Sequence, residues 1–544
     1  MGAIGIVLFM LAAVVVSSVL VRVIPLAIPV PLVQIALGAL IATASDHKVE
    51  LDPEVFFFLF LPPLLFLDGW RIPKEGLLRD KGMILELALG LVFLTVLGMG
   101  LFIHWMIPSM PYAVAFALAA IVSPTDPIAV SAITERVPMP KRVMHVLEGE
   151  SLLNDASGLV CFRFAVAAAL TGAFSLGSAA LTFVQLAVVG VVVGIALTLG
   201  IMWVKNWISR RFGEEAGLTV LLSLLIPFGA YELAEHFGGS GILAAVAAGI
   251  TMSYAELTGA ALASSRVQRT AVWDTMQFAL NGVMFVLLGE QLPAILSGAM
   301  EVVRFSNHDN PWWLAAYVLA INLGLAALRF AWVWFSIRIS AFVAERRGEA
   351  GAHRPPLRLV AAMSVAGVRG AITLAGVLTL PLALPDGSPF PARDLAIFLA
   401  AGVIIMSLVA SSVTLPRLLA TLPPPAEPAH DAEIDRAITA SAEAAIRGVE
   451  QALHELATGS SDADLYAEAA GRVMDFYRRR LQGHMAGEDA ARIRQSDNIE
   501  RHLRLAALRA ERDTLYAMAR ANQISDATSR QLVRNIDLLE ERLR

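Results

Sequence analysis

The chain has little cysteine and little charge. It contains a single cysteine, Cys161, among 544 residues, and only 16% of the residues are Asp, Glu, Lys or Arg. One cysteine excludes an intramolecular disulfide and a cysteine-based metal site, so we interpret Cys161, inside a hydrophobic segment, as a small core residue. The net charge is only −5 and the basic residues lie in short loops, which argues against nucleic acid as a partner.

Hydrophobic residues make up 57% of the chain and recur in runs of about twenty, the length that an α-helix needs to cross a bilayer. No stretch is left over for a large soluble enzyme core, so we do not expect an enzyme. Hydropathy predicts an all-α polytopic membrane protein with thirteen transmembrane helices, at residues 3–21, 27–44, 53–70, 83–105, 112–134, 143–171, 181–204, 217–236, 240–261, 272–298, 312–337, 358–381 and 393–418.

The loop charges predict an orientation. One set of alternate loops carries most of the Lys and Arg residues, and the other set holds only Lys48, Arg304 and Arg393. By the positive-inside rule the N-terminus is outside and the C-terminus cytoplasmic, which an odd number of spans requires. We therefore expect a multi-pass protein of the cell inner (plasma) membrane.

The composition changes after the last span. A proline-rich linker at residues 422–428 separates a transmembrane domain, residues 1–422, from residues 423–544, which are rich in Ala, Glu, Arg, Leu and Asp with helical spacing of apolar positions. This predicts a helical cytoplasmic tail. Regulation and a plain solvated appendage are both compatible with it.

Asp155 is the most informative residue of the sixth span. A carboxylate at membrane depth costs at least about 2.5 kcal/mol, so its presence points to ions or protons rather than to packing. Ser151, Asn154 and Asp155 have helical spacing that directs all three toward one region of the bundle. They offer oxygen ligands, which hard cations prefer, and the carboxylate can bind a proton instead.

The fifth span contains Ser123-Pro124-Thr125-Asp126-Pro127 at its middle. Two prolines three residues apart remove backbone donors and crowd the preceding turn, so we predict a break in the helix at Pro124 and Pro127. Broken helices at membrane depth expose backbone groups that bind ions, a recurring device of transporters. Thr125 and Asp126 would lie at this break.

The twelfth span has a second weak point, where Gly367 and Gly370 flank Arg369. An arginine inside the membrane needs a partner, and we predict an ion pair between Arg369 and Glu150. The alternative is that Arg369 reaches backbone carbonyls of the broken fifth span. Two other arginines near span interiors, Arg163 and Arg329, are interpreted as ion-paired or snorkelling within the bundle.

The two predicted breaks lie in spans five and twelve. This placement is expected if spans one to six and eight to thirteen are inverted repeats with span seven as a linker. In the third span, Asp68 follows the run Phe60-Leu61-Pro62-Pro63 near the cytoplasmic end. It is interpreted either as an interfacial residue that ends the helix or as part of the site.

At these residues the sequence resembles the sodium/proton exchanger branch of the monovalent cation/proton antiporters, which includes the bacterial NhaP-type proteins. The resemblance is carried by residues 60–69, 123–130, 149–158 and 367–376, in the order and spacing typical of that family, and covers the membrane part. It implies crossed broken helices five and twelve and a homodimer surrounded by membrane lipids. It also implies a dimer domain from about 1–72 and 181–298 and a core domain from about 83–171 and 312–418.

The resemblance also implies roles for residues. Asp155 would bind the cation and the proton alternately, while Asn154 and Asp126 shape the site and Ser151 and Thr125 lend oxygens. Asp68 would contribute from the dimer domain, and Glu150 with Arg369 would form a structural ion pair. The family needs no cofactor, and the only metal expected is the transported monovalent cation.

These residues suggest a mechanism. Burial raises the pKa of a carboxyl group and a nearby cation lowers it, so a proton and Na+ (or Li+ or K+) can compete for one acid. The resemblance implies antiport by elevator-like alternating access and a role in pH homeostasis. The single titratable acid of the Asn154-Asp155 pair suggests electroneutral 1:1 exchange. The alternative is a monovalent cation channel, which would use the same oxygen ligands without proton countermovement.

Overall fold

The structure is a computed structural model that divides into two compact units, Met1–Pro424 and Pro425–Arg544. The predicted proline-rich linker lies, up to residue 427, outside the described residues. The described residues are 3–24, 28–44, 53–72, 81–134, 139, 141–172, 176–256, 263–305, 312–346, 356–420, 428–457, 463–484, 488–521 and 523–543.

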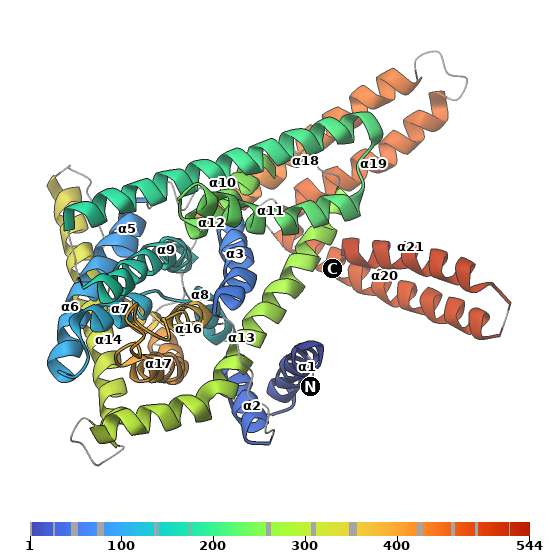
Figure 1. The fold of residues 1–544 in the computed structure, drawn as a ribbon. Coiled ribbons are helices and arrows are strands. Elements are labelled where there is room, and N and C mark those ends of the chain that lie inside the picture. The colour runs from blue at the N-terminus through green and yellow to red at the C-terminus, as the bar shows by residue number, and fades with distance from the viewer. Residues whose placement is uncertain are drawn as a thin grey trace. The chain divides into compact units, whose positions relative to one another are not determined.

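Helices make up the regular structure of the first unit, and the all-α prediction is confirmed (Figure 1). Apolar side chains dominate these helices, and a few charged residues, among them Glu150, Asp155, Arg329 and Arg369, are also buried. The elements are α1 (Ala3–Val23), α2 (Val30–Ala44), α3 (Pro53–Arg71), α5 (Lys81–Leu85), the π-helix η1 (Glu86–Leu91), α6 (Val92–Met106), α7 (Tyr112–Ile121), α8 (Pro127–Thr134), α9 (Lys141–Thr171), α10 (Leu176–Phe212), α11 (Ala216–His236), α12 (Gly241–Glu256), α13 (Ala263–Phe305), α14 (Trp312–Arg346), α15 (Leu357–Val365), α16 (Ala371–Leu378) and α17 (Arg393–Ala420).

Within the described residues, seven helical segments are long and apolar enough to cross a membrane, and α1, α2, α7 and α12 are shorter apolar helices. Each of the thirteen predicted spans coincides with one helix or with two or three consecutive helical elements of the described chain. The difference in number arises partly because two predicted spans are divided into short halves. The number of helices that cross the bilayer stays a prediction.

Both expected interruptions are present. Helix α7 ends at Ile121 and α8 begins at Pro127, where a missing backbone donor costs nothing in a first helical turn. Between α15 and α16, residues 366–370 are non-helical. The backbone N–H of Asp126 donates to the carbonyl of Val368 at 2.7 Å, so the two interruptions are joined directly. The crossing of the two helices and the inverted repeat stay predictions.

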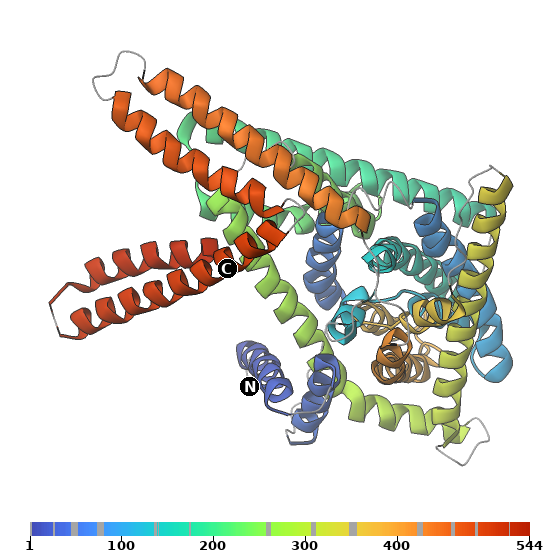
Figure 2. The same cartoon turned by 180° about the vertical axis from the view of Figure 1, so that it is seen from behind.

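Close packing at glycines fixes the helices on one side of the site. A Cβ atom at Gly289 of α13 would collide with the backbone carbonyl of Ile35, and one at Gly38 of α2 would lie 2.9 Å from the backbone nitrogen of Glu290. Helices α2 and α13 therefore approach each other backbone to backbone, which leaves little freedom for either to move alone. Viewed from both sides, α8, α9, α16 and α17 lie together, with α3 and α13 beside them (Figures 1 and 2).

The fourth predicted span contains a π-helix that is not predicted from the sequence. Residues Glu86–Leu91 form a π-helix between α5 and α6. A π-turn disturbs the regular ladder of backbone hydrogen bonds, and the carbonyl of Ala88 within it accepts a hydrogen bond of 2.7 Å from the hydroxyl of Ser157 on α9. The irregular turn thus contacts α9 at Ser157, two residues along the chain from Asp155.

The second unit consists of α18 (Pro428–Ala457), α19 (Ala463–His484), α20 (Glu488–Arg520) and α21 (Asp526–Leu543). Helices α18 and α19 lie side by side, as do α20 and α21 (Figure 2). Buried apolar residues of these four helices include Ala442, Ala470, Leu508 and Ile536. The polar composition of residues 423–544 therefore encodes amphipathic helices, as their spacing indicates.

Candidate ion-binding site

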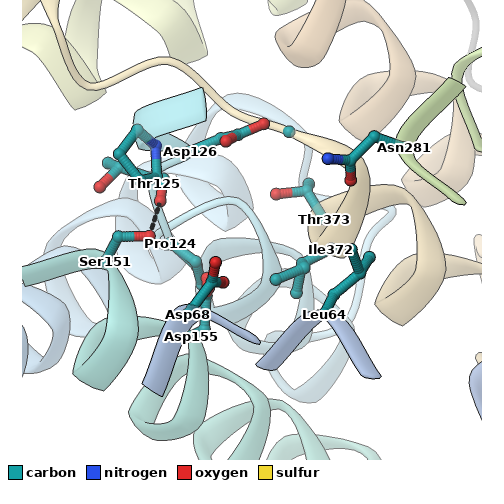
Figure 3. A pocket seen from close by; sticks show the side chains of 12 residues that line it. Leu64, Asp68, Pro124, Thr125, Asp126, Ser151, Asp155, Asn281, Ile372 and Thr373 are labelled. Atoms are coloured by element: carbon teal, nitrogen blue, oxygen red, sulfur yellow. Dashed lines mark hydrogen bonds between the residues drawn. The ribbon is translucent and has the colours of Figure 1, made fainter. Parts of the chain in front are cut away.

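A small cavity of about 30 Å³ lies where the two interruptions meet (Figure 3). It has room for a dehydrated monovalent cation or a water molecule. Its walls come from α3, the α7–α8 interruption, α9, α13 and the start of α16. The lining residues are Leu64, Asp68, Pro124, Thr125, Asp126, Pro127, Ser151, Asp155, Asn281, Gly370, Ile372 and Thr373.

Five of the six residues expected to bind cation or proton line this cavity, namely Asp155, Asp126, Thr125, Ser151 and Asp68. Asp155 is 3% exposed, whereas Asp126 and Asp68 are half-buried. Three carboxylates and the hydroxyl of Ser151 thus lie around one space, which matches the oxygen preference of hard monovalent cations.

The carboxylate of Asp155 is available to a ligand. In the described part of the chain it accepts no hydrogen bond from the protein, although it is buried and lines the cavity. The neighbouring hydroxyl of Ser151 instead donates to the backbone carbonyl of Thr125 at 2.7 Å (Figure 3). This bond ties α9 to the α7–α8 interruption. A buried carboxylate without protein donors is stabilised by a bound cation or by protonation.

Asn154, the sixth expected residue, lies behind the cavity rather than in its wall. Its amide nitrogen donates to the hydroxyl of Thr125 at 3.0 Å and approaches a carboxylate oxygen of Glu150 at 3.5 Å. Its side-chain oxygen is buried and has no hydrogen-bond partner among the residues that the structure describes. Asn154 therefore contacts the cavity wall through Thr125 and is not among the lining residues. Its role in shaping the site stays a prediction.

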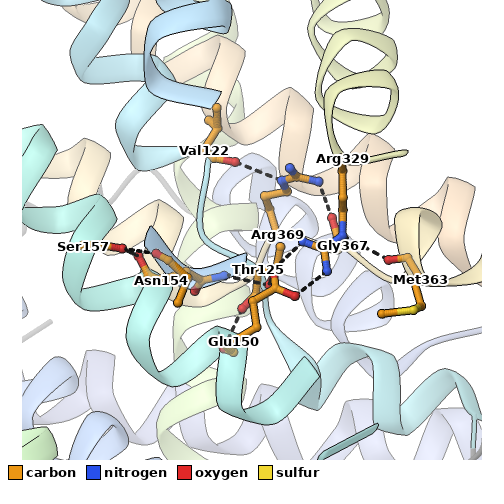
Figure 4. Close-up of polar contacts among 11 residues, drawn as sticks. Val122, Thr125, Glu150, Asn154, Ser157, Arg329, Met363, Gly367 and Arg369 are labelled. Atoms are coloured by element: carbon orange, nitrogen blue, oxygen red, sulfur yellow. Dashed lines mark hydrogen bonds and ion pairs between the residues drawn. The ribbon is translucent and has the colours of Figure 1, made fainter. Parts of the chain in front are cut away.

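Glu150 pairs with Arg329 of α14, not with Arg369 (Figure 4). Both guanidinium Nη atoms of Arg329 donate to the carboxylate, one of them at 2.7 Å to Oε2, and Nε donates to the carbonyl of Met363 at 3.0 Å. Glu150 is 0% and Arg329 3% exposed. The predicted direct pair of Glu150 with Arg369 is therefore wrong in its partner.

Arg369 instead binds backbone carbonyls at the two interruptions, which is the alternative given above. Its Nε donates to the carbonyl of Val122 at 2.9 Å, its Nη1 donates to the carbonyl of Gly367, and its backbone N–H donates to Ser407 at 3.1 Å (Figure 4). Val122 caps the C-terminus of α7, and Gly367 follows the C-terminus of α15. Helix C-termini carry partial negative charge and unsatisfied carbonyls, which explains why the guanidinium lies there.

Asp126 lies beside helix N-termini, whereas Arg369 lies beside helix C-termini. It immediately precedes Pro127, the first residue of α8, and a Cβ atom at Gly370 would lie 2.5 Å from its Cβ. Gly370 is the N-cap of α16. Helix N-termini carry partial positive charge, so the carboxylate suits this place as Arg369 suits the other. The residue at 370 must be glycine because the backbone of the second interruption passes directly against Asp126.

Two further polar residues, Asn281 and Thr373, line the cavity and are not predicted from the sequence. Thr373 lies in the stretch 367–376, but nothing in the sequence distinguishes it there from its neighbours. Asn281 lies in a long span with several polar residues, and only the packing of α13 brings it to the cavity. No spacing rule connects it with Asp155.

An all-helical membrane unit, in which two interrupted helices meet at a buried carboxylate cavity, defines the class of secondary transporters. The sequence matches the family profile "Sodium/hydrogen exchanger, transmembrane" over residues 9–421, and the chain belongs to this family of cation:proton antiporters. The family resemblance found from the sequence is confirmed. Its members are transporters and not enzymes.

Several relatives resemble the chain over much of its length. It is 42% identical to the uncharacterized Na(+)/H(+) exchanger YjcE of Escherichia coli K12, over 98% of this chain and 97% of that protein. It is 45% identical to a "Sodium, potassium, lithium and rubidium/H(+) antiporter" of Bacillus pumilus, over 76% of this chain and 60% of that protein. The fold matches that of the sodium proton antiporter MjNhaP1 of Methanocaldococcus jannaschii with a TM-score of 0.55 and 19% identity, covering 77% of this chain and 99% of that chain.

Proposed function

We propose that the protein exchanges a monovalent cation for H+, and that the cation and the proton compete for Asp155. Na+ is the first candidate, and Li+ and K+ are further candidates. The observation that carries the proposal is the cavity in which this buried carboxylate, without protein donors, faces Asp126, Asp68 and hydroxyl oxygens. A cation and a proton each neutralise the same acid, and both cannot do so together. The name of the Bacillus pumilus relative, which includes sodium, potassium and lithium, supports the breadth of candidates.

Charge balance supports an electroneutral 1:1 exchange. The ionisable residues that surround the two interruptions within the proposed core are Arg329, Arg369, Glu150, Asp126 and Asp155. Asp68 lies on α3, in the other wall of the cavity, and is not part of this set. When a proton or Na+ neutralises Asp155, the two arginines balance Glu150 and ionised Asp126. This set of core residues is then neutral when it is loaded and carries one negative charge when it is empty. Because a buried net charge is costly in a membrane, movement of the loaded form is favoured.

An elevator-like movement is the form of alternating access that we propose. Helices α3 and α13 form one wall of the cavity, and α9 and α16 with the α7–α8 interruption form the other. The first wall belongs to the proposed dimer domain, 1–72 and 181–298, in which α2 and α13 pack at glycines. The second wall belongs to the proposed core, 83–171 and 312–418. Relative movement of these walls would expose Asp155 to one side and then to the other.

The cellular setting is part of the same proposal. The excess of basic residues in one set of loops supports an N-terminus outside and a cytoplasmic C-terminus in the inner membrane. Cation:proton exchange in that membrane would serve pH homeostasis. We propose that the protein is a homodimer. The domain that contains α1, α2 and α10 would contact membrane lipids, since α10 exposes apolar residues such as Val184, Val188 and Leu199.

Flux in proteoliposomes tests the proposal. Purified protein is reconstituted with a pH gradient, and Na+, Li+ or K+ is added outside. We expect saturable dissipation of the gradient, no response from Asp155→Asn, and retained response from Asn322→Ala, a change of a polar residue on α14 outside the cavity. Cation conductance without proton movement would establish the channel alternative instead.

A further inference from the structure

One polar residue of the cavity comes from α13 and has no role in the proposed competition. Asn281 lines the cavity, and its side-chain amide faces Thr373 of α16 across the space (Figure 3). We propose that Asn281 is a specificity-determining ligand, which binds the cation through its amide oxygen and sets the size of cation accepted. This inference rests on the proposed function, because it concerns the same cavity.

The side chain is free to bind. Within the described residues, the amide of Asn281 makes no hydrogen bond, whereas Asn322 donates to the carbonyl of Val318 at 3.0 Å and Asn154 donates to Thr125. A half-buried amide beside a cavity normally bonds to protein or water. Its free oxygen therefore points to a ligand that enters the cavity.

The backbone behind Asn281 is held firmly. A Cβ atom at the next residue, Gly282, would lie 2.6 Å from Cγ1 of Val14 on α1 and 3.0 Å from Nε2 of Gln34 on α2. Close contacts with α1 and α2 thus hold this part of α13 in place within the proposed dimer domain. A ligand on a rigid element gives better discrimination of ion size than one on a mobile loop.

The chemistry of the amide separates the cation from the proton. An amide oxygen is a good ligand for a hard cation, but the amide does not titrate between neutral and alkaline pH. Loss of Asn281 should therefore weaken cation binding and leave proton binding to Asp155 unchanged. Truncation also widens the cavity on one wall, which favours K+ over Na+.

The test measures the apparent KM for Na+ and for K+ across a pH series in proteoliposomes. For Asn281→Ala we expect KM for Na+ to rise about three- to tenfold, as for loss of one neutral polar contact, with kcat retained. The plot of log KM against pH should move upward in parallel, with its bend at the same pH. The ratio of the KM for K+ to that for Na+ should fall.

Two further variants make the result specific. Asn281→Leu keeps the volume and removes the oxygen, so KM for Na+ should rise while the K+/Na+ ratio changes less than in Asn281→Ala. It also serves if Asn281→Ala does not fold. The matched control is Asn322→Ala, which should leave both KM values unchanged.

The outcomes distinguish this inference from the function beneath it. If the wild-type protein exchanges no cation for H+, the proposed function fails. If the wild type exchanges cations and both Asn281 variants keep the wild-type KM, the inference alone is overturned. A shift of the bend to another pH, or a loss of kcat with unchanged KM, would also overturn it, since Asn281 would then act on Asp155 or on the fold.

Discussion

Arg329 on α14 donates through both Nη atoms to the two carboxylate oxygens of Glu150 on α9, and neither side chain reaches solvent. The Nε of Arg329 also holds the carbonyl of Met363, near the end of α15. One arginine thus connects three core helices around the interrupted pair. Glu150 approaches Thr125 and Asn154 at 3.5 Å, so the pair also fixes the back of the cavity.

Loss of this pair should be costly. Glu150→Gln leaves the charge of Arg329 buried without a counterion, and we expect destabilisation by about 3–5 kcal/mol. Thermal unfolding of detergent-purified protein measures it. Glu468→Gln in the second unit is the control, since its partner Arg472 is exposed and the pair contributes little. A Glu150→Gln protein as stable as the control would show that the pair is not structural.

Asn154→Asp tests the packing behind the site. The amide nitrogen that donates to Thr125 and approaches Glu150 would become a carboxylate oxygen, so two like charges would lie close together in a buried place. We expect lower thermal stability in alkaline buffer and partial recovery in acid, because protonation of one carboxyl group removes the repulsion. Equal stability of variant and wild type at all pH values would contradict the contact.

Gly370→Ala tests the approach of the two interruptions. The added Cβ would collide with the side chain of Asp126, so the second interruption must move away from the cavity. We expect at least about a tenfold loss of exchange rate, comparable to a misplacement of the site by a fraction of an ångström. Gly200→Ala on α10 is the control, because nothing lies within 4 Å of its added Cβ. Normal exchange by Gly370→Ala would mean that this contact does not shape the site.

The ion pair between Arg163 of α9 and Glu235 of α11, at 3.0 Å, links the proposed core to the proposed dimer domain. A moving core must break it, so Arg163→Gln should speed exchange when core movement limits the rate. Both side chains are more than a third exposed, which limits the gain to about fivefold and makes it smaller at high salt. Stopped-flow proton flux measures the rate, with Arg472→Gln as control. A slower or unchanged rate would contradict a boundary at this place.

The two helix interruptions can be predicted from the sequence because their cause is local. Pro124 and Pro127 cannot donate backbone hydrogen bonds, and Gly367 and Gly370 weaken the second helix, so both breaks follow from residue type alone. Asp155 stood out for a similar reason, since the cost of a carboxylate in a membrane does not depend on its neighbours along the chain.

The partners of buried charges could not be predicted in the same way. Glu150 had two arginines within reach, and the choice between Arg329 and Arg369 depends on where the helix C-termini meet. Asn281 depends on how α13 packs on α1 and α2, and the π-helix at 86–91 on its contact with Ser157. These are tertiary relationships between segments far apart in the chain.

Competition at Asp155 can be measured directly as the apparent KM for Na+ against pH, with the maximal rate recorded at each pH. If one acid binds either ligand, KM should rise about tenfold for each unit of falling pH below the bend, while the maximal rate at saturating Na+ stays constant. A KM independent of pH, with a maximal rate that falls in acid, would show that the proton binds elsewhere and would contradict the account.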